Sequence, residues 1–317
     1  MHSYENSYSV GIDLGGTKSA CGLCSKEKIV KKKVIPTDAF REPSAILESI
    51  LEVALDLMED IDRSEIAGVG VGAPGQLDPV TNTVVYAPNL NWKNVPLGDW
   101  LSKKLFLPVK VVNDVRSATM AEFRYGAGKG LTDFVNIFVG TGIGSGLVSN
   151  GKLLEGFSNS AGEIGHICLD PNGPTCGCGK RGCLEAFSSG KGLENFVKNK
   201  LSQGFPSSIS DLVAGDFSKV TGKVIGAAAK EKDKLAIEAL ERVGKFLGIA
   251  FANIHTFLNP QTILIGGGLM ALREFILPAL DDSIRKHILP VANRPELFKP
   301  ATFENDAVVI GSGALFS

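Results

Sequence analysis

The stretch E-I-G-H-I-C-L-D-P-N-G-P-T-C-G-C-G-K-R-G-C-L-E, residues 163–185, decides how the rest of the chain is interpreted. Its one histidine and three of its four cysteines stand in the order of metal ligands: His166, Cys176, Cys178 and Cys183. Thiolates together with one imidazole are typical of tetrahedral Zn²⁺, and the intervening glycines let the backbone turn tightly around an ion. Because four protein ligands close the coordination shell, the pattern predicts a structural zinc loop over residues 166–183.

The alternative interpretation of this stretch is a glycine-rich loop with buried, metal-free thiols. The other cysteines carry weaker signals. Cys21 and Cys24 form a C-x-x-C pair in an apolar stretch, and we expect them to be buried and inert because a strand pattern surrounds Cys21. Cys168 follows His166 by two positions, and we expect a spare thiol beside the metal and not a ligand.

Composition excludes several classes of protein. The chain has 317 residues and a formal net charge of −1, so neither a nucleic-acid-binding surface nor a membrane-binding surface is indicated. No apolar run approaches the roughly 20 residues of a membrane-spanning helix, and the polar N-terminus lacks a signal-peptide core. The cysteine usage fits a reducing compartment, which predicts a cytoplasmic protein.

Three glycine-rich turns follow strand-like runs. The first is D-L-G-G-T-K, in which Asp13 ends a strand and can hold Mg²⁺ through water. The residues after Leu14 can bind phosphate through backbone N–H groups, a hydroxyl and a positive charge: Gly15, Gly16, Thr17 and Lys18. The second follows the strand 134–139 and begins with Gly140, Thr141 and Gly142. A plain hairpin turn is the alternative for one of them, but two in matching positions predict two similar α/β halves facing a nucleotide.

The third turn, Gly266, Gly267 and Gly268, follows a strand over 262–265 and can accommodate an adenosine against the backbone. Two further strands end in polar or glycine residues. The strand 66–71 leads to Gly75, and the strand 109–112 leads to Asn113 and Asp114. A carboxylate at a strand end can orient a hydroxyl and accept its proton. The alternative role of Asp114 is to cap a helix that we expect to start near Ser117.

The C-terminal part of the sequence has a helical pattern. A long helix is expected over 235–258, and a final strand and helix over 307–315 should return to the first domain. We expect a small α/β domain formed by residues 1–114 and about 300–317, and a large α/β domain formed by residues 115–299.

Together these motifs resemble the ROK family of sugar kinases, in particular its bacterial glucokinase branch, over nearly the whole chain. D-L-G-G-T-K, G-T-G-I-G-S-G and Gly266–Gly268 are similar to its phosphate and adenosine motifs. E-x-G-H and C-x-C-G-x-x-G-C-x-E are similar to its sugar and zinc segments, and the latter pattern is the more specific. The resemblance implies an actin-like, ribonuclease-H-like ATPase fold with two α/β domains around a cleft.

The resemblance also implies ATP- and Mg²⁺-dependent phosphorylation of glucose at its 6-hydroxyl, with Asp114 as the general base. The residues that it assigns to the sugar are Gly75, Asn113, Asp114, Glu163, His166 and Glu185. Kinases of N-acetylglucosamine, N-acetylmannosamine or fructose remain alternatives. Two alternatives come from other classes. A sugar-responsive repressor would need an N-terminal helix-turn-helix, and we expect none because Asp13 comes too early to leave room for it. A zinc-ribbon interaction module would not need the phosphate loops. The resemblance suggests a homodimer or homotetramer.

Overall fold

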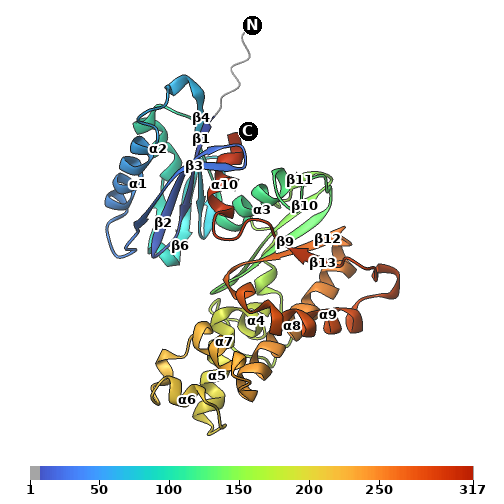
Figure 1. Cartoon of the computed structure of the whole chain (residues 1–317). Coiled ribbons are helices and arrows are strands. Elements are labelled where there is room, and N and C mark those ends of the chain that lie inside the picture. The colour runs from blue at the N-terminus through green and yellow to red at the C-terminus, as the bar shows by residue number, and fades with distance from the viewer. Residues whose placement is uncertain (1–7, 317) are drawn as a thin grey trace. The chain divides into compact units, whose positions relative to one another are not determined.

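The computed structural model describes residues 8–316, which form two compact units (Figure 1). The first unit contains the chain up to Thr132, residues 146–162 and the segment from Ala301 onward. The second contains residues 133–145 and 163–300, including the predicted zinc loop. Compactness does not identify a hinge, so the domain boundaries expected near residues 114 and 300 stay a prediction. Among the described residues, no helix is both long and apolar enough to cross a membrane.

The first unit is built on a five-stranded sheet of order β3-β2-β1-β4-β8. Its first three strands are antiparallel neighbours: β1 (Tyr8–Leu14), β2 (Lys18–Ser25) and β3 (Lys28–Pro36). The strands β4 (Ile66–Ala73) and β8 (Val109–Asn113) then continue the sheet parallel to β1. The carboxyl ends of β1, β4 and β8 therefore meet at one edge, which is where ligands bind in open α/β sheets.

A second five-stranded sheet repeats this order, with β11-β10-β9-β12-β13. Its strands are β9 (Phe134–Val139), β10 (Ile143–Ser149), β11 (Lys152–Leu153), β12 (Thr262–Gly266) and β13 (Phe298–Pro300). β12 runs parallel to both β9 and β13. In each sheet the first strand in the chain lies in the centre and is followed by a glycine turn, so the prediction of two similar α/β halves is confirmed.

A small third sheet of β5 (Gln76–Asp78), β6 (Thr83–Ala87) and β7 (Trp92–Val95) was not predicted. Its strands contain three to five residues each, which is too short to give a clear alternation of apolar and polar positions. The sheet follows the turn after β4. It fixes the polar loop before Trp92, which contains a 3₁₀ turn over Pro88–Leu90.

Four helices belong to the first unit. α1 (Pro43–Leu57) and α2 (Leu97–Leu105) lie together on one side of the sheet in Figure 1 and contribute to one apolar core with β1, β4 and β8. α3 (Asp114–Arg124) packs against α10 (Ala307–Gly313), which also contacts β1 and β4. The return of the last helix to the first sheet is thus confirmed, whereas the strand expected in the same segment is wrong. The residues after α10 form a 3₁₀ turn, Ala314–Phe316.

Glycines let α10 approach its neighbours closely. A Cβ atom at Gly11 of β1 would lie 1.9 Å from the Val309 carbonyl oxygen, and one at Gly311 would lie 1.7 Å from the Ser117 carbonyl oxygen. Hydrogen bonds then fix the contact, because the Ser117 hydroxyl lies 2.8 Å from the Ser312 hydroxyl, and Ser312 donates to the Ile12 carbonyl at 3.2 Å. The contacts of α10 with β1 and α3 therefore require glycine at positions 11 and 311.

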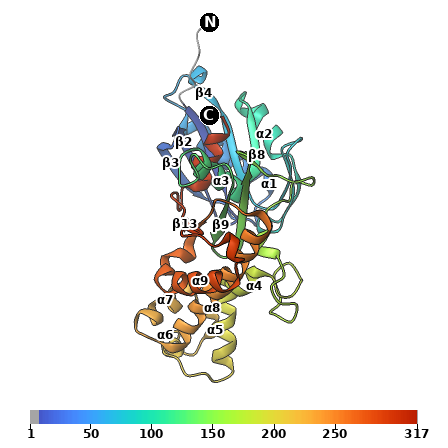
Figure 2. The same cartoon turned by 90° about the vertical axis from the view of Figure 1, so that its right-hand side faces the viewer.

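Apart from β9, β12, β13 and the start of β10, the second unit is largely helical. α8 packs along α9 through Gly244 and Gly248, whose added Cβ atoms would meet the backbone or Ser283 of α9 at 2.2–2.7 Å. Figure 2 shows α5, α6 and α7 gathered beside α8, and contacts among these helices support that view. The helices are α4 (Leu184–Ser188), α5 (Gly190–Ser202), α6 (Ile209–Leu212), α7 (Gly222–Lys230), α8 (Lys234–Leu258) and α9 (Arg273–His287). Further 3₁₀ turns occur at Arg63–Glu65, Ile164–His166, Phe217–Lys219, Gly268–Leu272 and Pro290–Ala292.

The close approach of α10 to β1 makes a testable prediction. Gly11→Ala should lower the free energy of unfolding by about 1–3 kcal/mol, because a methyl group at 1.9 Å from a backbone oxygen forces the helix away from the sheet. Gly222→Ala is the matched control, since nothing lies within 4 Å of its added Cβ at the start of α7. Urea denaturation of both variants measures the difference. Equal stability of the two variants would contradict the packing described.

Candidate active site

The polar residues predicted at the strand ends of the first unit come together at one edge of its sheet. Asp13 of β1 is in register with Gly72 of β4, and Gly72 is in register with Val112 of β8. Asn113 and Asp114 follow directly after Val112. The parallel strands thus bring Asp13 and Asp114 to the same edge although 100 residues separate them in sequence, as the numbering shows.

Asp114 is the first residue of α3, and Asn113 is its N-cap. The Asn113 side-chain oxygen accepts hydrogen bonds from the backbone N–H groups of Val115 (3.1 Å) and Arg116 (3.3 Å). The Asp114 carboxylate accepts from Val115 N at 2.8 Å. The helix therefore starts three residues before the expected Ser117, and the interpretation of Asp114 as the cap is wrong because Asn113 occupies that position. Asp114 is half-buried at the end of β8.

Asp13 has an unusual electrostatic environment. Burial of the carboxyl and, to a smaller extent, the negative charge of Asp114 raise its pKa from 3.8 to about 6. Lys18 and Lys32 act in the opposite direction. Two carboxylates that repel each other at a strand edge are stabilised by a bound cation, so the residues present fit the Mg²⁺ expected at Asp13.

The phosphate turn between β1 and β2 leaves its backbone accessible. Gly15 and Gly16 are half-buried, whereas Thr17 and Lys18 are exposed. A Cβ atom on Gly16 would lie 2.5 Å from the Asn89 carbonyl oxygen, so this position requires glycine. The polar loop at residues 88–92 thus lies against the turn.

Gly75 lies in the turn between β4 and β5. Its φ of +91° is in the region that favours glycine, and an added Cβ atom would meet the Tyr86 carbonyl oxygen at 2.2 Å. Gly75 is therefore held between β4 and the small sheet, in the same compact unit as Asn113 and Asp114.

Glu185 joins two predicted motifs of the second unit. One carboxylate oxygen accepts a hydrogen bond from Ile143 N at 2.9 Å, directly after the turn formed by Gly140, Thr141 and Gly142. A Cβ atom on Gly142 would lie 2.5 Å from that same oxygen. The other carboxylate oxygen lies 3.6 Å from the Cys176 sulfur. The second phosphate turn and the metal loop thus share one carboxylate.

The third glycine turn combines a strained and an open position. Gly267 has a φ of +97°, and its added Cβ atom would lie 2.6 Å from backbone atoms of Val139. Nothing lies within 4 Å of the corresponding atom on Gly268. Gly266 ends β12, so the turn exposes backbone at the carboxyl end of a parallel strand, where a flat base can lie.

His166, Cys176, Cys178 and Cys183 converge in the second unit, and their ligand atoms all lie within 4.8 Å of one another. The sulfurs of Cys178 and Cys183 are 3.7 Å apart, as are the Cys176 sulfur and His166 Nδ1. A tetrahedron with zinc–sulfur bonds of about 2.3 Å has edges of about 3.8 Å, so the four residues fit a zinc ion. Cys176 and Cys183 are buried, whereas His166 and Cys178 are exposed.

The remaining predicted residues are placed as follows. Glu163 is exposed and immediately precedes the 3₁₀ turn that carries His166. Cys21 and Cys24 are buried, and burial raises the pKa of each thiol to about 12, which agrees with inert thiols. Cys168 is exposed and lies outside the convergent group, as expected.

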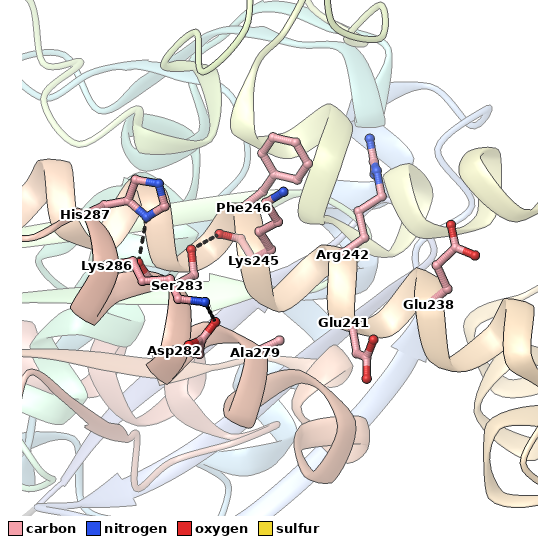
Figure 3. Close-up of a pocket in the computed structure, with 10 residues that line it drawn as sticks. All are labelled: Glu238, Glu241, Arg242, Lys245, Phe246, Ala279, Asp282, Ser283, Lys286 and His287. Atoms are coloured by element: carbon pink, nitrogen blue, oxygen red, sulfur yellow. Dashed lines mark hydrogen bonds and ion pairs between the residues drawn. The ribbon is translucent and has the colours of Figure 1, made fainter.

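A separate groove of about 640 Å³ lies between α8 and α9 (Figure 3). It contains an ion pair between Lys286 and Asp282 at 2.6 Å, and Ser283 donates to the Lys245 carbonyl at 2.7 Å. None of the predicted site residues lines this groove. Its balanced charges favour no particular ligand.

Comparison with known proteins identifies the chain. The model of the ROK family matches residues 9–317. The chain belongs to the ROK family. The glucokinase of Halalkalibacterium halodurans is 36% identical over 315 residues, covering 96% of this chain and 94% of that protein. The Escherichia coli transcriptional dual regulator NagC is 30% identical over 287 residues, covering 90% of this chain and 69% of the regulator.

A solved structure also matches. The ROK family glucokinase from Streptomyces griseus, in complex with glucose and AMPPNP, superposes with a TM-score of 0.83 at 30% identity, and the match covers 98% of this chain and 99% of that one. This ROK protein therefore has the actin-like, ribonuclease-H-like ATPase fold that the resemblance implied.

Two polar residues near the first strand edge were not assigned from the sequence. Asn89 contacts Gly16 from the loop at residues 88–90, and only the composition of that loop marked it. Arg116 is buried in the first turn of α3. No local pattern in the sequence marked Arg116, because a charged side chain in the first turn of a helix is ordinarily exposed.

The metal loop makes one prediction. Cys178→Ser should lower zinc content and melting temperature together, because removing a thiolate opens the coordination shell. Cys168→Ser is the matched control, since its sulfur lies outside the convergent group, and it should retain zinc. Elemental analysis and calorimetry measure both quantities. Full zinc content in Cys178→Ser would exclude Cys178 as a ligand.

The environment of Asp13 makes another prediction. Its folded pKa is raised, so the stability that the protonated carboxyl provides is complete below pH 3.8 and is lost as pH rises to about 6. Without Mg²⁺, Asp13→Asn should therefore be more stable than the wild type at pH 7 by up to about 3 kcal/mol, and by little at pH 4.

Urea denaturation between pH 4 and 8 checks this expectation. Asp60→Asn is the control, because Asp60 is exposed and its hydrogen bond from Lys31 lowers its pKa, so any effect should be small and of opposite sign. A stability difference for Asp13→Asn that does not change with pH would contradict the raised pKa.

Proposed function

We propose that the protein is an ATP-dependent glucokinase that phosphorylates glucose at the 6-hydroxyl, with Asp114 as the general base. The observation that carries the proposal is the pair of carboxylates, Asp13 and Asp114, at the edge where β1, β4 and β8 end. The similarity to glucokinases over almost the whole chain supports the same reaction.

Asp114 is suited to accept the proton of the attacking hydroxyl. One of its oxygens is oriented by Val115 N at 2.8 Å, which fixes the carboxylate relative to α3. Phosphoryl transfer needs a base that orients the nucleophile and neutralisation of the charge on the transferred group. The negative charge of Asp114 beside Asp13 also attracts a cation. Asp114 would therefore accept the proton, whereas Asp13 would hold Mg²⁺.

The nucleotide is proposed to bind through the three glycine turns. Backbone N–H groups of Gly15, Gly16 and Gly142, with Thr17, Lys18 and Thr141, would bind phosphates. Gly140 would shape the second turn, because its N–H donates to the Gly142 carbonyl at 2.9 Å. Gly266, Gly267 and Gly268 would contact adenosine. Mg²⁺ bound near Asp13 would supply the neutralising charge. A side chain would clash with backbone at Gly16 and at Gly267, and at Gly142 it would displace the Glu185 carboxylate, so glycine keeps each turn close to where the ligand would lie.

Sugar recognition is assigned to Gly75, Asn113, Asp114, Glu163, His166 and Glu185. Carboxylates accept hydrogen bonds from hydroxyls, which a hexose presents in a fixed pattern. The zinc loop would position Glu163, His166 and Glu185, because its ligand His166 follows Glu163 and its ligand Cys176 contacts Glu185. A structural metal thereby orients substrate-binding groups without taking part in the transfer.

Other sugars and another class remain to be separated by experiment. An N-acetylated hexose or fructose would use the same carboxylates. The similarity to NagC covers 90% of this chain and 69% of that regulator, so a regulatory role is the alternative from another class. A cytoplasmic location is proposed with the function, since a sugar kinase needs ATP. A homo-oligomeric state is proposed from the family resemblance.

The decisive experiment is a coupled kinase assay with ATP and Mg²⁺ on glucose, fructose, mannose, N-acetylglucosamine and N-acetylmannosamine. Preference for glucose supports the proposal. Preference for an N-acetyl sugar would keep the mechanism and replace the substrate. No turnover with any hexose in zinc-containing protein would contradict the kinase function and favour a regulatory role.

Asp114→Asn should lower kcat by about 10²–10⁴-fold, because the amide cannot accept the hydroxyl proton, while glucose affinity changes little. The amide oxygen can still accept the hydrogen bond from Val115 N, so the helix start should be preserved. Steady-state kinetics and calorimetric titration with glucose measure the two effects, with exposed Asp60→Asn as the control. Turnover near the wild-type rate would remove Asp114 from the mechanism.

A further inference from the structure

A buried arginine links three segments of the first unit. Arg116 lies in the first turn of α3 and is only 5% exposed. Its guanidinium donates hydrogen bonds to the side-chain oxygen of Asn159 and to the backbone carbonyls of Glu155 (3.3 Å) and Ala161 (3.1 Å). A cation from the helix that begins with Asp114 therefore holds the segment 155–161.

Asn159 extends the connection to the small sheet. Its side-chain nitrogen donates to the Leu77 carbonyl of β5 at 3.0 Å. The amide thus uses its oxygen toward Arg116 and its nitrogen toward Leu77. Two side chains join α3, the segment 155–161 and β5, which are distant in sequence but belong to the same compact unit.

Each residue that the hydrogen bonds join lies two positions from a residue of the proposed sugar site. Arg116 follows Asp114 by two residues, Leu77 follows Gly75 by two residues, and Ala161 precedes Glu163 by two residues. Asp114, Gly75 and Glu163 are three of the residues assigned to the hexose. The hydrogen bonds therefore act just beside the residues that would contact the substrate, on all three segments.

The segment 155–161 is itself closed. Ala161 N donates to the Glu155 carbonyl at 3.0 Å, and Gly156 has a φ of +76°, which permits the turn. Arg116 binds both ends of this closed loop with one nitrogen. Because a guanidinium is planar and offers several donors in fixed directions, it sets the loop's position on α3 more narrowly than a single hydrogen bond would.

We propose that Arg116 and Asn159 form a clamp that sets the affinity for the hexose by positioning Gly75 and Asp114 and by fixing the loop that leads into Glu163. Both are positioning residues, since their contacts are to protein groups. The inference rests on the proposed kinase function. The clamp contacts given above involve neither the turn at residues 13–18 nor the turn at residues 140–142, so nucleotide affinity should be independent of it.

Arg116→Met tests the clamp while keeping a long apolar stem in the buried position. The glucose Kd and KM should rise about 10–100-fold, as is typical when groups that orient ligand-contacting residues are lost, and the KM for ATP should stay within twofold. Arg116→Lys should be intermediate, because an ammonium keeps the charge without the planar fork. Arg124→Met, at the exposed end of the same helix, is the matched control and should bind glucose like the wild type.

Asn159→Asp provides a second variant that does not remove the buried cation. Its carboxylate still accepts from Arg116 but cannot donate to the Leu77 carbonyl, so glucose affinity should again fall. Calorimetric titration with glucose in the absence of nucleotide gives the Kd for each variant. Amide hydrogen exchange over residues 155–161 should become faster in Arg116→Met and in Asn159→Asp, and remain unchanged in Arg124→Met.

The outcomes separate the clamp from the proposed function. Glucose affinity within twofold of the wild type in both Arg116→Met and Asn159→Asp would overturn the clamp and leave the kinase function intact. Equal losses for glucose and ATP would also overturn it, because a general structural defect does not discriminate between substrates. A wild-type protein that neither binds nor phosphorylates any hexose would instead contradict the proposed function itself.

Discussion

Repulsion between two carboxylates is the interaction around which the first unit is arranged. Asp13 and Asp114 reach the same sheet edge because β1, β4 and β8 are parallel and in register. Their mutual effect, added to burial, raises the pKa of Asp13 to about 6. The raised pKa lowers the free energy of unfolding at neutral pH. Perturbed pKa values of this kind are typical of functional sites.

In the second unit, the polar residues of the predicted site lie on irregular backbone that needs another means of fixing its position. The loop over residues 166–183 is rich in glycine and has little apolar surface to bury. Convergence of three thiols and one imidazole supplies the missing order if zinc binds. Glu185 then connects this loop to the turn after β9, because its carboxylate contacts both Cys176 and Ile143 N. The predicted zinc loop and the glycine turn at residues 140–142 are therefore not independent.

Close backbone packing connects the end of the chain to its beginning. α10 rests on Gly11 of β1 and on α3 through Gly311, and α3 begins with Asp114. The same helix α3 carries Arg116, whose hydrogen bonds reach the loop at residues 155–161 and, through Asn159, β5. The position of the proposed base thus depends on a helix that is held by a C-terminal element on one side and by a buried cation on the other.

The sequence by itself determined the motifs and their chemistry. Glycine turns after buried strands, the metal-ligand order from His166 to Cys183 and the acids at strand ends are local patterns, and local patterns are what short-range sterics and coordination chemistry impose. Only the tertiary structure decided that Asn113 is the cap and Asp114 the first helical residue, that Glu185 bridges two motifs, and that Arg116 is buried against residues 155–161. The contacts of Glu185 with Ile143 N and of Arg116 with residues 155–161 join segments tens of residues apart, and their partners depend on sheet register and helix packing, which no local pattern specifies.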